Sequence, residues 1–339
     1  MKDKATLRRV VQLPLGLPFL VLVVLALPWR RIRVGRLRSE RIGHYLMNTE
    51  LALCATDDER RSGSRPVIDF YFDVPPISNE QIQVMWKRRL RIGPRWLLQP
   101  AYFILVALRL RSFVIDSPAE DRDVSDCFAR KAPFLSFTSR EEREARSQVA
   151  ELLGSEDAQW VCLHQRDSAY LSQRMGNRDW GYHSYRDTPI QDYKLAAELL
   201  ARGGYKVIRM GKVVAEPLPF HFPGVIDYPN HALRSDFLDV YLAAHCAFFL
   251  STGSGIDSVA TVFRRPQLLV NFPLAFHPLI GNSNHLFIYQ HFRDAETGAP
   301  LSLHELAERR AWQLFSTTEF ERAGISLSRN SSQEIADAA

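Results

Sequence analysis

The chain has 339 residues, which is enough for two domains that each bury a hydrophobic core. Its 46% hydrophobic and 24% charged residues are typical of a globular protein and exclude a disordered or fibrous chain. Residues 1–41 hold ten Lys and Arg against two acids, so the rest of the chain is slightly acidic and the basic charge does not indicate nucleic-acid binding.

The N-terminal segment is apolar and is followed by positive charge. Residues 10–29 contain no charged side chain, and five arginines follow within residues 30–38. This length is close to what spans a bilayer. Because Pro14 and Pro18 interrupt the first half, we instead expect residues 10–38 to lie on a membrane surface, with the arginines on anionic headgroups. A true span, a cleaved signal peptide and a buried hairpin are the alternatives.

A first α/β unit is predicted between residue 31 and about residue 130. Its elements, in order, are a strand at Ile32–Val34, a helix with Ile42, Tyr45, Leu46 and Leu53 on its apolar face, a strand at Val67–Phe72 and a helix with a Ser78/Gln81 capping box. The apolar residues 94–113 fit a helix or a strand. The charged, aperiodic residues 116–131 are typical of a linker.

The four cysteines are far apart in the sequence, and two of them lie in strand-like apolar runs. This distribution predicts buried free thiols in a reducing compartment and neither disulfides nor a metal site. The four are Cys54, Cys127, Cys162 and Cys246.

The second unit has a more regular pattern. Thr138 or Ser139, with Glu141 or Glu142 three residues on, predicts a capped helix. Strands are predicted at 160–164, 205–210, 225–228, 246–251 and 267–271, and helices begin at Thr188–Gln191, at Ser235 and after Gly255. Strands that alternate with helices predict a parallel, doubly wound sheet.

Polar residues follow each of these strands. In open α/β sheets, ligands bind outside the carboxyl ends of the strands, at a switch in strand order. Guanidinium groups suit phosphate oxygens and a carboxylate suits a ribose or base, so the pattern predicts a site for a nucleotide diphosphate. The residues are His164, Arg166 and Asp167, then Arg209 and Gly211, then Asp227, then Thr252, Gly253, Ser254 and Gly255, and finally Asn271.

The segment Phe248–Ser258 carries the uncharged part of this predicted site. A buried strand runs into the TGSG turn, and Ile256, Val259, Ala260 and Phe263 then follow with helical spacing. Free N–H groups at such a turn, together with the helix dipole, favour an anion. A tight turn with a serine N-cap and no ligand is the alternative.

Several sequence blocks also resemble a family of bacterial glycosyltransferases that are associated with surface-polysaccharide clusters. The resemblance covers about residues 31–335 and rests on RIGHYLMNTELAL, VCLHQRDSAYL, YKVIRMG, VIDYPN, SDFLDVYLAAHCAFFLSTGSGIDSV and QLLVNFP. It implies two Rossmann-like α/β domains facing a cleft, the glycosyltransferase B type. The chain is also distantly similar to fucosyltransferases, in which an arginine at the position of Arg166 neutralises the donor phosphate.

The resemblance implies a division of labour along the chain. Residues 31–135 would bind the acceptor and residues 136–335 a nucleotide-sugar donor, while residues 1–30 are expected from their own apolar and basic pattern to associate with the membrane. The implied reaction moves a hexosyl or deoxyhexosyl group to a cell-surface polysaccharide or a lipid-linked glycan at the cytoplasmic face of the inner membrane. Ser331 and Glu334 predict a final helix of about one turn, which is shorter than in relatives and would weaken the bracing of the two domains.

Transfer without a metal needs a cation at the departing diphosphate and a base for the attacking hydroxyl. Arg166, with Arg209, is the predicted cation, and His44 is the predicted base, with a purely structural His44 as the alternative. Asp121 and Asp123 have the D-x-D spacing of a manganese site but lie in the predicted linker, so we expect no metal and no cofactor.

Three other functions fit the same architecture. A glycerol-phosphate or pyruvyl transferase on surface polymers would also bind a phosphate-bearing donor at the strand ends. A non-catalytic nucleotide-binding scaffold subunit of polysaccharide assembly would bind the donor without turnover. A dehydrogenase ranks last because no G-x-G-x-x-G follows the first strand.

Overall fold

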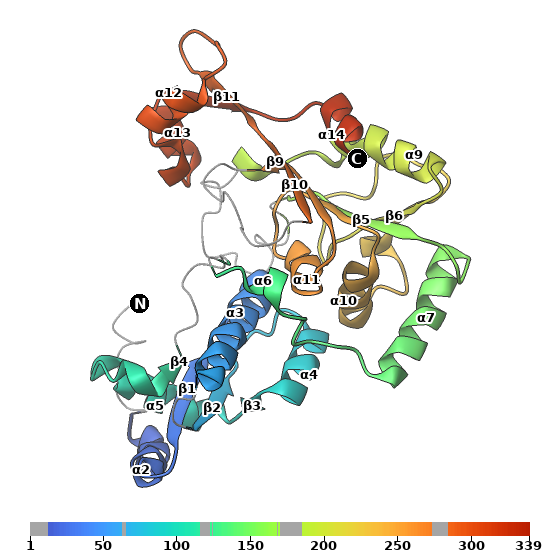
Figure 1. The fold of residues 1–339 in the computed structure, drawn as a ribbon. Coiled ribbons are helices and arrows are strands. Elements are labelled where there is room, and N and C mark those ends of the chain that lie inside the picture. The colour runs from blue at the N-terminus through green and yellow to red at the C-terminus, as the bar shows by residue number, and fades with distance from the viewer. Residues whose placement is uncertain are drawn as a thin grey trace. The chain divides into compact units, whose positions relative to one another are not determined.

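The computed structural model describes residues 13–62, 66–115, 123, 125–167, 169, 185–272 and 284–339. The chain forms two compact units, Met1–Ser136 and Phe137–Ala339, and each is built on its own parallel sheet (Figure 1).

Unit 1 contains a four-stranded parallel sheet in the order β3-β2-β1-β4. Each strand is joined to the next by a helix, as parallel pairing requires. The strands are β1 (Arg31–Arg36), β2 (Val67–Phe72), β3 (Arg91–Ile92) and β4 (Val114–Ile115), and the helices are α3 (Ile42–Arg61), α4 (Glu80–Arg89) and α5 (Arg95–Ala107), with a short η2 (Arg111–Phe113) before β4 and α6 (Cys127–Arg130) after it. The ambiguous residues 94–113 are therefore mainly helix.

The cap of α4 differs from the prediction by one residue. Asn79, and not Ser78, is the N-cap, and its side chain accepts a hydrogen bond from Ile82 N at 3.0 Å. Ser78 is buried, and its N–H donates instead to Ser39 O at 2.8 Å. Ser78 therefore joins two loops, a contact that no local sequence pattern reveals.

The N-terminal apolar segment forms η1 (Leu13–Gly16) and α2 (Leu17–Ala26), which pack on unit 1. Phe19 and Val23 of α2 are buried in the same core as Ala101 of α5. A Cβ on Gly16 would lie 2.5 Å from Ala101 N, so this close approach requires glycine. In the part of the chain that the structure describes, no helix is long and apolar enough to cross a membrane.

The prediction of four free thiols is wrong for two of them. Cys54 of α3 and Cys127 of α6 form a disulfide, with their Cα atoms 6.3 Å apart, whereas Cys162 and Cys246 are free and buried. The bonded pair is separated by 73 residues, and the pairing depends on how α6 packs on α3. Sequence spacing alone does not report such a contact.

Unit 2 contains a six-stranded sheet in the order β10-β9-β8-β5-β6-β7, in which every pair is parallel. The predicted doubly wound sheet is therefore present, with β10 as an additional edge strand. Its strands are β5 (Trp160–His164), β6 (Lys206–Arg209), β7 (Val225–Asp227), β8 (Phe249–Ser251), β9 (Gln267–Phe272) and β10 (His285–Tyr289).

The helices of unit 2 follow the predicted order with one shifted start. Thr188–Gln191 was expected to open a helix, but η4 (Ile190–Tyr193) comes first, and the Thr188 hydroxyl bonds Tyr193 Oη at 3.3 Å and caps no helix. The expected caps at Thr138 and Ser235 are confirmed. The helices are α7 (Ser139–Leu153), α9 (Lys194–Arg202), η5 (Tyr228–Asn230), α10 (Asp236–His245) and α11 (Asp257–Val262).

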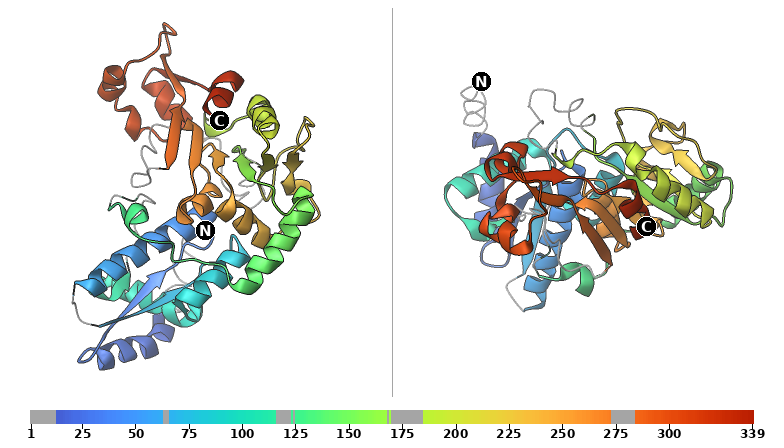
Figure 2. Two further views of the ribbon diagram at one scale, coloured as in Figure 1. Left: turned by 45° about the vertical axis from the view of Figure 1, so that its right-hand side comes forward. Right: turned by 90° about the horizontal axis from the view of Figure 1, so that it is seen from above.

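The C-terminal part of unit 2 was not predicted in detail. An antiparallel ribbon of β11 (His291–Asp294) and β12 (Ile325–Ser328) packs with α12 (Leu303–Glu308), η7 (Ala311–Gln313) and α13 (Thr317–Arg322) around a small apolar core (Figure 1). The final helix α14 (Ser332–Ala338) starts with the predicted Ser331/Glu334 capping box. It lies beside α9 in Figures 1 and 2 and buries Ile335 in the core of unit 2.

Candidate active site

The candidate site lies where the strand order of unit 2 switches. After β5 the chain builds β6 and β7 on one side, and it then returns to place β8 on the other side of β5. The ends of β5 and β8 are therefore neighbours, with His164 paired with Ser251 in register. Just beyond them, Arg166 N donates to Thr252 Oγ1 at 3.2 Å, so the two loops predicted to share a ligand are in direct contact.

Two guanidinium groups meet at this switch point. Arg166 is mostly buried and lies 3.2 Å from Asp187 Oδ1, and Arg186 donates through Nη2 to Gly253 O. Burial and then the neighbouring charge of Arg166 lower the pKa of Arg186 to about 10. The pKa of Asp187 is raised by burial, against the opposing effect of Arg166. Arg166 and Arg186 are close enough for their charges to repel, and a bound anion would relieve this repulsion.

The turn after β8 is organised by Asp257, the first residue of α11. Its Oδ2 accepts hydrogen bonds from Ser251 Oγ at 2.8 Å and from Ser254 N. The predicted free N–H at Ser254 therefore already has a partner, because the protein supplies its own carboxylate at the start of the helix. The spacing of Ser254 and Asp257 contains this signal, although the sequence analysis did not use it.

Gly253 is required by the backbone of this turn. Its φ is 76°, in the left-handed region, and a Cβ would lie 2.8 Å from Phe272 Cε2 of β9. The turn therefore packs against the next strand and also presents its Gly253 carbonyl to Arg186.

The buried Arg209 pairs with the half-buried Asp227 beside the switch point. Arg209 at the end of β6 is 1% exposed and donates to Asp227 Oδ1 at 3.2 Å and to Glu216 O at 2.9 Å. Asp227 Oδ2 also accepts from Leu218 N and Asn230 Nδ2. Both side chains therefore hold the loop after β6. Arg209 is too deeply buried to contact a ligand directly.

Asp167 and Gly211 hold the same loop. Asp167 accepts from Ala169 N at 3.0 Å and from Ala215 N at 3.1 Å, which ties the segment after β5 to the segment after β6. Gly211 lies in that loop, where a Cβ would approach Val214 Cγ1 to 3.0 Å. The predicted residues are thus brought together, but several of them shape the edge of the sheet.

His164 is neutral in this setting. Burial lowers its pKa to about 4, and Nδ1 bonds Ser254 Oγ at 3.0 Å. At neutral pH it therefore links β5 to the turn without adding to the positive charge.

His44 belongs to unit 1, and Asn271 lies near the end of β9 in unit 2. His44 is in the first turn of α3 in unit 1, with Nδ1 2.9 Å from Asn48 Oδ1. When Nδ1 carries the proton, as this acceptor requires, the lone pair of the neutral ring is on Nε2. Asn271, with a φ of 51°, forms reciprocal 2.6 Å bonds with Asn330 and so joins β9 to the chain before α14.

The structure explains one of the two aspartates of the D-x-D pattern. Asp123 is buried and accepts from Cys127 N at 2.8 Å and Phe128 N at 2.7 Å, so it caps α6. Asp121 lies outside the described residues. Among the residues that the structure describes, no group of three His, Cys, Asp or Glu side chains is placed to hold a metal ion.

Comparisons with known proteins address the fold. No protein-family model and no curated protein matches the chain. Among solved structures, it is similar to the glycosyl transferase family 9 structure from Veillonella parvula DSM 2008, with a TM-score of 0.51, 8% identity and coverage of 91% of this chain and 95% of that one. It is also similar to E. coli ADP-heptose LPS heptosyltransferase II, with a TM-score of 0.44, 13% identity and coverage of 76% and 90%. For E. coli heptosyltransferase WaaC with ADP, the TM-score is 0.40, the identity 14% and the coverage 83% and 99%. The family 9 structure shows that this chain has the mixed α/β fold with parallel sheets of a glycosyltransferase.

Proposed function

We propose that this protein is a glycosyltransferase that takes a sugar from a nucleotide-diphosphate donor. The observation that carries the proposal is the pair Arg166 and Arg186 at the β5/β8 switch point, next to the glycine turn at Gly253. The likeness in fold to a family 9 glycosyltransferase supports it.

The repulsion between Arg166 and Arg186 favours a diphosphate over a neutral ligand. Arg166 pairs with Asp187, and the pKa of Arg186 is lowered by burial and by Arg166. A bound diphosphate would relieve that repulsion and accept charge-assisted hydrogen bonds from both guanidinium forks. Arg209 is neutralised by Asp227, so in this proposal it holds the loop beside the two arginines.

The proposed chemistry assigns one role to each unit. The bond between the sugar C1 and the diphosphate oxygen breaks, and the electron pair leaves with the diphosphate, whose charge Arg166 and Arg186 stabilise. The acceptor hydroxyl oxygen forms the new bond to C1 and gives its proton to His44 Nε2. In this scheme residues 136–335 bind the donor and residues 31–135 bind the acceptor.

The acceptor and the cellular place are further parts of the proposal. We propose a cell-surface polysaccharide or lipid-linked glycan as acceptor, at the cytoplasmic face of the inner membrane, with no metal required. The apolar α2 supports a membrane location.

Donor binding tests the proposal most directly. A thermal-shift panel of uridine, guanosine, adenosine and cytidine diphosphate sugars should contain a stabilising donor, whose Kd is then measured by calorimetry. We expect Arg166→Ala and Arg186→Ala each to weaken it by about 10- to 100-fold, since a charged hydrogen bond contributes about 1.5–3 kcal/mol. Arg143→Ala is the matched control, because Arg143 is exposed on α7 and loses the same charge.

Other outcomes would redirect the proposal. Stabilisation by CDP-glycerol or phosphoenolpyruvate, without any nucleotide sugar, would favour transfer of glycerol phosphate or pyruvate. Donor binding without hydrolysis or transfer to any glycan would favour a scaffold subunit. His44→Ala should keep the donor Kd and lose turnover, and full turnover would remove His44 from the mechanism.

A further inference from the structure

We propose that α2 and α5 of unit 1 form one membrane-docking surface that binds the headgroup region of an anionic lipid bilayer. The surface is defined here as the exposed apolar residues of α2 and of α5 with the turn that follows it. It deepens the proposed membrane location, and it does not depend on the reaction. The residues are Leu17, Val21, Leu22, Val24, Leu25, Trp29, Trp96, Val106, Leu108 and Leu110.

Helix α2 is apolar on every side, although only one stripe of it is buried. Phe19 and Val23, four residues apart, face the core of unit 1. The remaining positions of this helix are also Leu, Val, Pro and Ala, and Val24 and Leu25 are 62% and 64% exposed. A helix on the surface of a soluble domain normally carries polar residues on its outer face. The outer face of α2 therefore requires an apolar environment.

Helix α5 continues the same surface. It contacts η1 and α2 and buries Leu98, Ala101 and Leu105 on one stripe. Its other end leads into a turn in which Leu108 is 63% exposed and Leu110 is also exposed. Two neighbouring segments far apart in the sequence thus expose apolar side chains.

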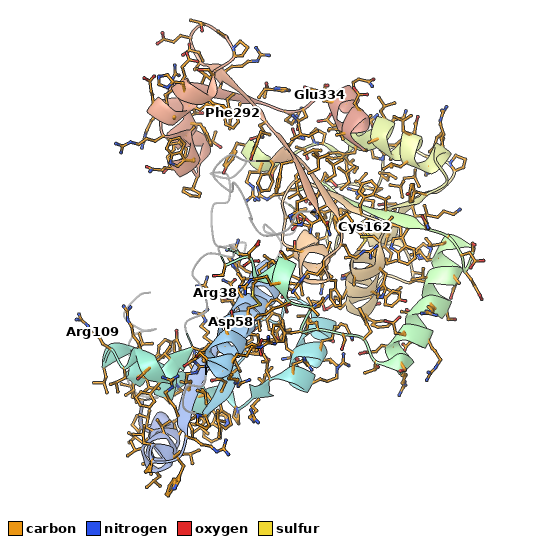
Figure 3. All side chains as sticks on the ribbon, viewed as in Figure 1. Arg38, Asp58, Arg109, Cys162, Phe292 and Glu334 are labelled. Carbon is orange, nitrogen blue, oxygen red and sulfur yellow. A yellow bond between two sulfur atoms is a disulfide. The ribbon has the colours of Figure 1, made fainter. Side chains whose placement is uncertain are left out.

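All charged residues within the two segments that form this surface are positive. Residues 13–39 and 91–115 contain no Asp or Glu. Arg30, Arg95, Arg109 and Arg111 are exposed at the ends of the two helices, and none of them forms a salt bridge within the described part of the chain. Figure 3 shows Arg109 at the end of α5, on the outer edge of unit 1. This charge complements anionic headgroups.

The geometry favours an interfacial position over a span. Helix α2 has ten residues and is about 15 Å long, roughly half of a hydrocarbon core of about 30 Å. Phe19 and Val23 also attach it to unit 1, so it cannot leave the domain without exposing the core. Trp29 and Trp96 are both exposed at this surface, and tryptophan favours the boundary between headgroups and acyl chains.

Vesicle co-sedimentation of the full-length chain, without any nucleotide, tests the proposal. We expect binding to vesicles of equal parts phosphatidylcholine and phosphatidylglycerol, weaker binding to phosphatidylcholine alone, and quenching of tryptophan fluorescence by brominated lipid. Val24→Glu and Leu108→Glu should each weaken vesicle binding about tenfold, because each removes several apolar carbons that would be buried in the bilayer. The matched controls are Val84→Glu on α4, in the same unit, and Leu303→Glu in unit 2, both at exposed positions.

Each result decides the proposal. Equal binding by Val24→Glu and Val84→Glu would overturn it, and unchanged binding by Leu108→Glu would remove α5 from the surface. A wild-type chain that ignores vesicles but forms a dimer that Val24→Glu dissociates would show self-association instead. Circular dichroism checks that the variants fold. A donor thermal shift retained by Val24→Glu separates this surface from the donor site.

Discussion

Both units bury arginine within or at the end of a parallel sheet, but the partners of these arginines differ. In unit 1, Arg33 of β1 forms a two-pronged pair with Asp69 of β2, at 2.7 and 3.0 Å, and also contacts Glu59 and Thr56 of α3. Burial lowers the pKa of the Arg33 guanidinium, but Asp69 and Glu59 together raise it by more. In unit 2, burial and Arg166 both lower the pKa of Arg186.

This difference separates structural charge from charge available to a ligand. The unit 1 network neutralises itself across the sheet and α3, so it stabilises the fold and offers nothing to an anion. The unit 2 edge brings Arg166 and Arg186 close enough to repel each other, at the position where doubly wound sheets bind ligands. The closeness of two like charges, more than the presence of arginine, identifies the site.

The largest expected effect is the loss of stability when the unit 1 network around Arg33 is broken. Arg33→Ala should lower the free energy of unfolding by about 3–5 kcal/mol, because it leaves Asp69 buried without its main partner. Arg60→Ala is the control: Arg60 is half-exposed and also pairs with Asp69, at 3.3 Å, so its loss should cost about 0–1 kcal/mol. Urea unfolding measures both. Equal costs would mean that the network is not the structural element described above.

The next largest expected effect is a loss of stability at acidic pH. The unfolded chain protonates His164 below about pH 6.5, and the folded chain does so only near pH 4. Stability should therefore be unaffected above pH 6.5 and fall as the pH drops from 6.5 towards 4, by about 3 kcal/mol from this group. Urea unfolding across that range should show a shallower fall for His164→Gln than for wild type. His304→Gln, at an exposed position, should behave as wild type.

A smaller effect on stability should distinguish the turn after β8, which contains Gly253, from an ordinary turn. Gly253 and Gly204 both have positive φ, 76° and 95°, so alanine strains either backbone by about 1 kcal/mol. Only Gly253→Ala also forces a carbon against Phe272, since nothing lies within 4 Å of a Cβ at Gly204. Thermal unfolding should show Gly253→Ala as the less stable variant. The reverse order would contradict the packing described for the turn.

The smallest expected change in stability, that of Arg166→Ala, contrasts most sharply with the loss expected for Arg33→Ala in unit 1. Arg166→Ala should change the free energy of unfolding by less than about 1 kcal/mol in the absence of ligand, because the loss of the Asp187 contact is offset by relief of repulsion with Arg186. The same urea unfolding experiment measures it beside Arg33→Ala. A loss as large as that of Arg33→Ala would make Arg166 a structural residue.

Local patterns predicted much of the fold and part of the site. The caps at Thr138, Ser235 and Ser331 were found because a capping interaction spans only three residues. The Cys54–Cys127 disulfide and the contact of Ser78 with Ser39 were missed, since each joins segments that meet only in the folded chain. The ribbon of β11 and β12 was missed because its strands are separated by helices and pair antiparallel.

The sequence by itself predicted a parallel sheet with arginines and a glycine turn at its strand ends, because strand and helix periodicities are local properties of the chain. The strand order β10-β9-β8-β5-β6-β7 is a tertiary property, and it places the end of β5 beside the end of β8. Tertiary packing also brought Arg166 and Arg186 close enough to repel each other, whereas Arg209 became buried against Asp227. Charge balance depends on distances across the fold, and a linear pattern does not contain those distances.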